Sequence, residues 1–256
     1  MSKNNPQNKY MQISKMFASV QDLLGVITLL LATVQCLTFI IPGKAFLTIS
    51  GIVLIMEFLA SYFSSINFDK GHSIREVALL DNSFSEKRIP NYDSETYYNN
   101  GSIRDGYIKL LANIHENALF TSNISSKMYT PYFALSGIVF VLFLIKLFMS
   151  GMDDYSSLLL SFIVSSSFFN RAIKINSLKK ATEDVLNKAN ELCNLYEKNS
   201  IEINILFPKI IELVLMYENT IFESKIILSE RIFKKSNTKL SEEWNKIRDG
   251  YSIYSN

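Results

Sequence analysis

The sequence has few of the residues from which metal and redox sites are built. Its 256 residues include only two cysteines and two histidines. Cys36 and Cys193 form no metal-binding motif, and we interpret them as small apolar residues rather than a disulfide. His115 is followed by Glu116 but lacks the further ligands of a zinc site. The sequence therefore predicts no metal centre and no cofactor.

Enzyme motifs are also lacking. The chain contains no glycine-rich phosphate loop, no nucleophile elbow and no closely spaced cysteine pair. Its formal net charge is only +2, which does not favour a general nucleic-acid-binding protein. We therefore expect a protein that is not an enzyme, has no catalytic residues and does not bind nucleic acid directly.

Charged residues are scarce in four stretches and crowded into the rest of the chain. Residues 23–41 carry no charge and are long enough to cross a hydrocarbon core, which needs about 20 residues. A short turn around Pro42 separates them from residues 45–66, whose only charge is Glu57. Two apolar helices joined by so short a turn form a hairpin, so residues 23–66 are predicted to be transmembrane hairpin 1.

A second pair of apolar stretches predicts transmembrane hairpin 2 over residues 131–173. Its two spans are residues 131–149 and residues 155–173. The last span is short and rich in serine, which neighbouring helices can shield from lipid. We keep this span because Asp153 and Asp154 would otherwise lie on the same side of the membrane as the basic C-terminal region.

The orientation follows from lysines and arginines near the membrane ends, which favour the cytoplasmic side. The two short turns have only Lys44, Lys146 at a helix end and two aspartates, whereas basic residues are more numerous beside the other segments. The turns are therefore predicted to lie outside. The N-terminal segment (1–22), the insert (67–130) and the C-terminal region (174–256) are then cytoplasmic, as are both termini. The basic residues are Lys3, Lys9, Lys15, Lys70, Arg75, Lys127, Arg171, Lys174, Lys179 and Lys180.

The cytoplasmic segments are predicted to be helical. Ser73 and Glu76 form a capping box that opens a short helix, and an apolar stripe over residues 103–118 predicts a second one. Residues 207–233 are apolar, but each of their charges would cost about 2.5 to 3.5 kcal/mol at mid-membrane, so we expect a buried soluble helix. The predicted fold is an all-α integral membrane protein with four transmembrane helices in two hairpins, a helical cytoplasmic insert and a helical cytoplasmic C-terminal region.

Glu57 is the sharpest functional candidate, because a carboxylate inside a membrane is a functional-site hypothesis by default. It is expected near the middle of its span. It either faces a water-filled path between helices or subunits, or stays protonated and hydrogen-bonded to Gln35 or a serine inside the bundle. Ser157, Ser161 and Ser165 recur every four residues and form either a packing seam of small side chains or the polar wall of a pore with Glu57.

Two other patterns point to binding surfaces. A polar tract in the insert is either a solvated loop or a ligand site, because aromatic rings stack on bases and Asn side chains read base edges. Its candidates are Tyr92, Tyr97, Tyr98, Asn99 and Asn100. A heptad seam after the last span is either intramolecular packing or a homo-oligomer interface. Its candidates are Ile175, Leu178, Val185, Leu192 and Tyr196.

The layout and several local strings resemble a known family. Two hairpins of membrane helices flank a cytoplasmic insert, and the chain contains REVALLDNSFSEKRIPNY, IHENALFTSNISSKM and LSEEWNKIRDGY. This resembles the four-transmembrane effectors of bacterial anti-phage defence, often called the S-4TM family, which are linked to cyclic-nucleotide signalling of the CBASS type. The resemblance implies a protein of the bacterial inner membrane that senses a cyclic nucleotide, assembles into a homo-oligomer and permeabilises the bilayer.

The sequence supports two functions from different classes. The first is a signal-gated effector whose spans associate into a leak when a cytoplasmic ligand favours the assembled state. The second is a non-conducting membrane anchor or adaptor whose cytoplasmic helices recruit a partner. A transporter fits less well, because the spans contain no broken helices in matching positions.

Overall fold

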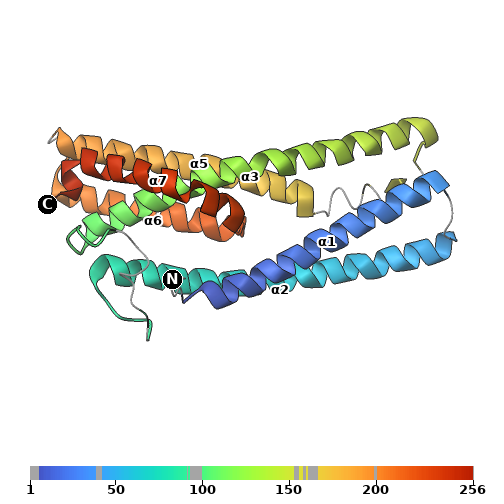
Figure 1. Cartoon of the computed structure of the whole chain (residues 1–256), viewed down its shortest axis with the longest axis horizontal. Coiled ribbons are helices and arrows are strands. Elements are labelled where there is room, and N and C mark those ends of the chain that lie inside the picture. Colours follow the sequence, from blue (N-terminus) through green and yellow to red (C-terminus); the bar gives the residue numbers. More distant parts are fainter. Residues whose placement is uncertain are drawn as a thin grey trace. The chain divides into compact units, whose positions relative to one another are not determined.

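The computed structural model describes residues 6–38, 42–90, 92, 100–152, 156–157, 160, 167–198 and 201–255. Over these residues the protein is helical and contains no strand, which confirms the all-α prediction. The elements are α1 (Asn8–Thr38), α2 (Gly43–Phe84), α3 (Tyr107–Ser150), α5 (Ser167–Glu197), α6 (Ile203–Ser224), α7 (Glu230–Gly250) and the short 3-10 helix η2 (Ser252–Tyr254) (Figure 1).

Two of the helices are longer than the sequence predicted. The capping box at Ser73 does not open a helix, because α2 continues through it without interruption and ends at Phe84. Gly71 lies inside this helix and costs it only about 1 kcal/mol relative to alanine, which packing offsets. Likewise, α3 starts at Tyr107 and runs through Pro131, where we expected a span to begin. A proline weakens a helix at one hydrogen bond but need not end it.

The chain divides into two compact units. The apolar unit consists of Met11–Phe68 and Tyr129–Lys174, and it contains both predicted hairpins. The bundle unit consists of Met1–Tyr10, Asp69–Met128 and Ile175–Asn256. The chain passes from one unit to the other inside α1, α2, α3 and α5, so every passage is made by a helix rather than by a loop.

In the apolar unit, α1 and α2 form an antiparallel hairpin (Figure 1). The Ser14 hydroxyl donates to the Ser64 carbonyl at 2.8 Å, and the Ser64 hydroxyl donates to the Ser14 carbonyl at 3.0 Å. The rings of Phe17 and Phe63 stack with their centroids 5.3 Å apart. The predicted pairing of these two apolar stretches in one hairpin agrees with this contact, which also fixes the register of the two helices.

In the bundle unit, α3, α5, α6 and α7 bury a common core. The heptad seam of α5 is part of it: Ile175, Leu178 and Val185 are completely buried, and Leu192 is 6% exposed. Only Tyr196 at its end is half-buried. These side chains pack inside a single chain, the intramolecular alternative, so the described part of the seam offers almost no surface to a second copy.

Replacing Leu178 with alanine tests this packing. We expect the Leu178→Ala variant to lower the free energy of unfolding by about 2 to 5 kcal/mol, because it removes a fully buried side chain and leaves a cavity. Because the contact lies within one chain, the loss should be the same at low and high protein concentration. Denaturation in detergent measures both. The exposed Lys180→Ala variant is the control, and a loss that disappears at high concentration would contradict intramolecular packing.

Candidate functional site

The apolar unit has a mixed interior and an apolar surface. Among the residues described, large apolar side chains such as Phe46, Phe68 and Phe143 are buried together with polar ones. The buried polar side chains include those of Ser14, Thr28, Ser50, Glu57, Ser136 and Ser156. Its surface also carries large apolar side chains, with Phe148 87% exposed, Met149 81% and Phe58 69%. Water-soluble proteins rarely expose so many large apolar side chains. The small polar side chains inside allow close helix approach, as in membrane bundles.

Two helices in the described part of the chain are long and apolar enough to cross a membrane. They are α2 and α3, over Gly43–Phe84 and Tyr107–Met149. In the most apolar 18-residue segment of each helix, only 22% and 17% of the residues are buried. Neither segment is therefore a core segment of the kind found in soluble proteins. α1 does not meet the same criterion over its described residues, and about half of the predicted span over residues 155–173 lies outside the described residues.

Glu57 lies inside the apolar unit, as expected for a carboxylate that avoids the outer surface. It is 6% exposed and shares the buried face of α2 with Ser50 and Ala60. Seven residues separate it from Ser64, which pairs with Ser14, so the antiparallel register places it opposite the turn of α1 near Asp22. Glu57 is thus near the middle of residues 45–66 but opposite the start of residues 23–41, and the two predicted spans are offset along the helix pair.

The other pore candidates are only partly within the described residues. Gln35 lies in α1, but its side chain is not among those that the structure describes. Ser161 and Ser165 lie outside the described residues. Ser157 is on the exposed side of its helical turn. The neighbouring Ser156 is the buried serine, and its hydroxyl donates to the Gly151 carbonyl at 3.2 Å.

Three charged or aromatic side chains meet where three predicted spans end. The Arg171 guanidinium of α5 forms an ion pair with the Asp22 carboxylate of α1 and lies 5.4 Å from the centre of the Tyr132 ring of α3. Asp22 is the last residue before the first predicted span, and Tyr132 is the second residue of the third. Arg171 is 17% exposed and Asp22 is 28% exposed. This cluster links three helices of the apolar unit at one level.

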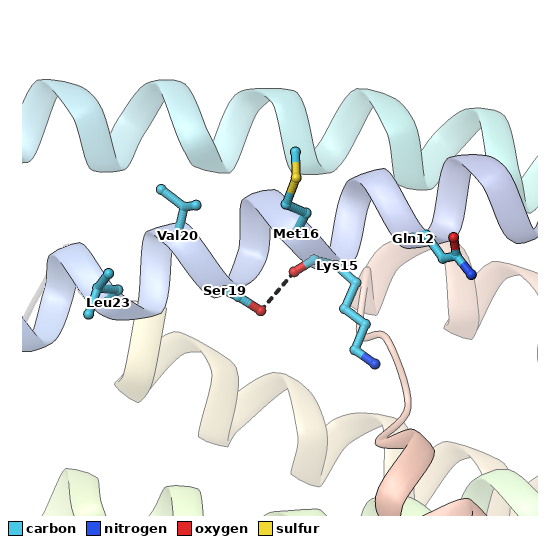
Figure 2. A pocket seen from close by; sticks show the side chains of 6 residues that line it. All are labelled: Gln12, Lys15, Met16, Ser19, Val20 and Leu23. Atoms are coloured by element: carbon cyan, nitrogen blue, oxygen red, sulfur yellow. Dashed lines mark hydrogen bonds between the residues drawn. The ribbon is translucent and has the colours of Figure 1, made fainter.

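A shallow open groove of about 500 Å³ follows the outer face of α1 close to this level (Figure 2). Gln12, Lys15 and Ser19 contribute its polar part, and the Ser19 hydroxyl donates to the Lys15 carbonyl at 2.9 Å. The apolar part is formed by Met16, Val20 and Leu23. Polar and apolar side chains alternate along this face of α1, and of the lining residues only Leu23 belongs to the predicted first span.

The predicted ligand tract contains a structural residue. Asn100 is completely buried, and its amide donates to Asn113 Oδ1 and to Glu116 Oε2, both at 2.9 Å. Its oxygen accepts from the Trp244 indole at 3.1 Å. Asn100 therefore uses its hydrogen-bonding capacity inside the bundle unit and is not available to a ligand. Tyr92 is half-buried, whereas Tyr97, Tyr98 and Asn99 lie outside the described residues.

A second buried polar cluster joins α3 to the end of the chain. His115 Nδ1 is 3.0 Å from the Tyr254 hydroxyl, and the same hydroxyl is 3.3 Å from Cys193 Sγ. The His115 and Trp244 rings meet edge to face, with their centroids 5.3 Å apart. Burial lowers the pKa of His115 to about 4 and raises the pKa of Cys193 to about 11, so both groups are neutral at pH 7.

Another cluster in the bundle unit has the spacing of a metal site. A ring nitrogen of His72 and carboxylate oxygens of Glu76 and Glu218 all lie within 4.8 Å of one another. Arg75 forms an ion pair with Glu218, and its Nη2 is 3.5 Å from His72 Nδ1. A neutral ring that accepts at Nδ1 presents Nε2–H to the two carboxylates, at 3.4 and 3.8 Å. This geometry is that of an ion-pair network, and sequence reasoning missed it because α6 is distant in sequence.

Burial of neutral His115 predicts a loss of stability in acid. Its pKa is about 4 in the folded protein and about 6.5 when unfolded, so between these values the unfolded chain binds a proton that the folded chain does not. The contribution of His115 to the free energy of unfolding should therefore stay constant above about pH 6.5 and fall as the pH drops from 6.5 to 4. The loss should reach about 3 kcal/mol. Denaturation of the protein at a series of pH values measures this change.

The control is the His115→Gln variant, in which most of this pH dependence should disappear. His72 and Glu218 do not mask the effect, because their contributions oppose each other. Burial, with the Arg75 charge, lowers the pKa of His72 to about 4, while burial raises the pKa of Glu218 to about 7. Acid therefore disfavours the folded state through His72 and favours it through Glu218. An unchanged pH profile in His115→Gln would show that another group is responsible.

Comparison of the chain with protein-family models, with curated proteins and with solved structures gave no match. Its function is therefore inferred from the residues described above.

Proposed function

We propose that the protein is an integral membrane effector that permeabilises a bacterial inner membrane when its cytoplasmic part receives a signal. The observation that carries the proposal is the apolar unit, with its many large apolar side chains on the surface and polar side chains among those buried inside. In water, a surface that exposes Phe58, Phe148 and Met149 together with many other apolar residues would aggregate. In a bilayer the same surface is solvated by lipid.

The proposed topology keeps four spans in two hairpins. α2 and α3 supply the second and third spans, and the apolar parts of α1 and of the segment that leads into α5 supply the other two. The cluster of Arg171, Asp22 and Tyr132 supports a common cytoplasmic end for three of these spans, because charged and aromatic side chains favour the membrane interface.

Continuity of the helices supports the idea of gating. α1, α2, α3 and α5 each contribute to both units, so a shift or rotation of these helices in the bundle unit must move their apolar parts as well. A ligand can open the membrane part only if it binds the open arrangement more tightly than the resting one. By the family resemblance, this ligand is a cyclic nucleotide, and the open state is a homo-oligomer.

The alternative is a non-conducting anchor or adaptor. One observation favours it: the heptad seam is buried within the chain, so the described residues of α5 do not provide an obvious interface for oligomer assembly. The bundle unit would then serve as a docking platform for a partner protein, and the apolar unit would only hold it at the membrane.

Membrane insertion is tested by placing a charge on the apolar surface. Ile52 is 54% exposed and lies within the apolar part of α2. If lipid covers it, Ile52→Asp should cost about 2.5 to 3.5 kcal/mol on insertion and sharply reduce the amount of protein in the membrane fraction. The matched control is Leu215→Asp in α6 of the bundle unit, where 57% exposure should make the change nearly neutral.

The measurement is the distribution of each variant between soluble and membrane fractions after equal expression. Equal membrane recovery of the Ile52→Asp and Leu215→Asp variants would mean that water covers Ile52, and the membrane proposal would fail.

Permeabilisation is tested at Glu57. If this carboxylate lines a conducting path, Glu57→Leu should dry the path and abolish leakage, since hydrophobic constrictions gate by dewetting. Glu57→Gln should keep assembly and leakage but change ion preference. The measurement is membrane potential and dye entry in bacteria that express each variant at an equal, verified level.

The matched control for this test is Met56→Leu, one residue away and 50% exposed, which should leave leakage unchanged. Undiminished leakage from the Glu57→Leu variant would assign Glu57 a structural role. An absence of leakage from the unmodified protein, even with cyclic nucleotides supplied, would favour the anchor.

A further inference from the structure

The first half of α7 has an exposed basic surface formed by Arg231, Lys234 and Lys235. We propose that this basic surface binds the anionic headgroups of phospholipids in the cytoplasmic leaflet. The inference rests on the proposed membrane location, but it concerns a different unit of the protein from the spans and is independent of whether they conduct ions.

Charge is distributed unevenly along α7. Residues 230–239 contain the basic side chains of Arg231, Lys234, Lys235 and Lys239 and a single acidic residue, Glu230. Residues 240–250 instead carry more acidic than basic side chains. The helix macrodipole does not account for this basic half, because its effect is confined to the first turn, where Arg231 lies beside Glu230. The positive charges of Lys234 and Lys235 are therefore open to an external anionic partner.

The basic side chains are accessible to such a partner. Arg231, Lys234 and Lys235 are all exposed, and Phe233 between them is 41% exposed. The opposite face of the helix is the one that packs on the bundle, and its buried residues are Ser236, Leu240 and Trp244. Lys234 does form an ion pair with Glu230 at 2.7 Å, but both side chains are more than half exposed, so the pair is weak in water.

Two contacts hold the start of α7 and the preceding loop beside residues that adjoin the predicted spans. The Ser229 backbone N–H is 3.3 Å from Met128 Sδ, and Met128 comes three residues before the third predicted span within the same helix, α3. Lys225 forms an ion pair with Asp69 at 2.8 Å, and Asp69 comes three residues after the second predicted span within α2. The corner between α6 and α7 therefore lies beside Met128 and Asp69, the residues at which α3 and α2 leave the bundle unit for the predicted spans.

The direction of α7 follows from its contacts with α3. The Lys127 ammonium donates to the Ser236 hydroxyl at 2.7 Å, and the rings of His115 and Trp244 meet further along. Residue numbers rise along α7 as they fall along α3, so the two helices are antiparallel and α7 leads away from the predicted span.

This register gives approximate distances along the axis of α3, counted from Pro131, the residue of this helix at which the third predicted span begins. At 1.5 Å per residue, Arg231, Lys234 and Lys235 lie within about 10 Å of that point. A headgroup layer is about 5 to 8 Å thick, and the Debye length at physiological ionic strength is about 8 Å. The basic surface is therefore within reach of lipid phosphates. Lys239 and Lys246 lie at about 15 and 25 Å, where screening removes most of the attraction.

The distances provide a matched pair of variants. Lys234→Glu/Lys235→Glu and Lys239→Glu/Lys246→Glu reverse the same number of charges on exposed positions of the same helix. They change net charge equally and differ in their distance from the start of the third predicted span along α3; the first variant also removes the weak ion pair of Lys234 with Glu230. Far-ultraviolet circular dichroism checks that both variants remain folded.

The experiment measures which phospholipids stay bound to the full chain. Protein is purified in detergent supplemented with equal amounts of phosphatidylglycerol and phosphatidylcholine, and the retained lipids are quantified by mass spectrometry. We expect the unmodified protein to retain phosphatidylglycerol in about fivefold preference, the ratio for one basic side chain at an anionic surface. Lys234→Glu/Lys235→Glu should bring the ratio near one, and Lys239→Glu/Lys246→Glu should leave it unchanged.

Equal retention of the two lipids by the unmodified protein, or equal loss of the preference in both variants, would overturn the inference. Its failure is distinguishable from failure of the proposed function. Leakage and membrane insertion are measured separately, through the Glu57 and Ile52 variants, and neither depends on lipid preference at α7.

Discussion

The apolar surface of the apolar unit is the constraint on which the rest of the structure depends. Large apolar side chains cover its outside, while serine, threonine and Glu57 side chains lie between the helices together with apolar residues such as Phe46. A hydrocarbon solvent favours the burial of these polar groups, because it cannot hydrogen-bond to serine, threonine or carboxylate groups. Beside the first predicted span, the serine pair of α1 and α2 holds the two helices together, since each hydroxyl donates to the other residue's carbonyl.

The bundle unit has a largely apolar interior, yet it also buries polar and charged side chains such as Asn100, His115 and Glu218. Asn100 accepts a hydrogen bond from Trp244, the only tryptophan of the chain, and His115 is hydrogen-bonded to Tyr254 near the C-terminus. Buried polar networks are costly when one partner is lost. They therefore fix the end of the chain against α3 more specifically than apolar packing alone.

Both units share their helices, and this connects membrane and cytoplasm in the proposed function. A helix resists bending and local unwinding because each residue contributes a hydrogen bond to its neighbours in the chain. α2 and α3 run through both units without a loop, so each connection between the units in these two helices is helical. The antiparallel packing of α7 on α3 places the basic start of α7 beside the part of α3 that leads to the predicted span, and the acidic end of α7 further from it.

The sequence by itself determined the helical class, the two apolar stretches that meet in the first hairpin and the burial of Glu57, because each depends on local composition and periodicity. It did not determine that α2 continues through Ser73 to Phe84. A capping-box pattern marks the start of a helix only where the residues before it are not helical, and packing decides whether they are. Nor did it show that Asn100 is a core residue or that Arg75 meets Glu218. Asn100 and Trp244 are 144 positions apart, and Arg75 and Glu218 are 143 positions apart. Only tertiary packing decides which distant polar groups are buried together, because partners so far apart leave no periodic pattern in the sequence.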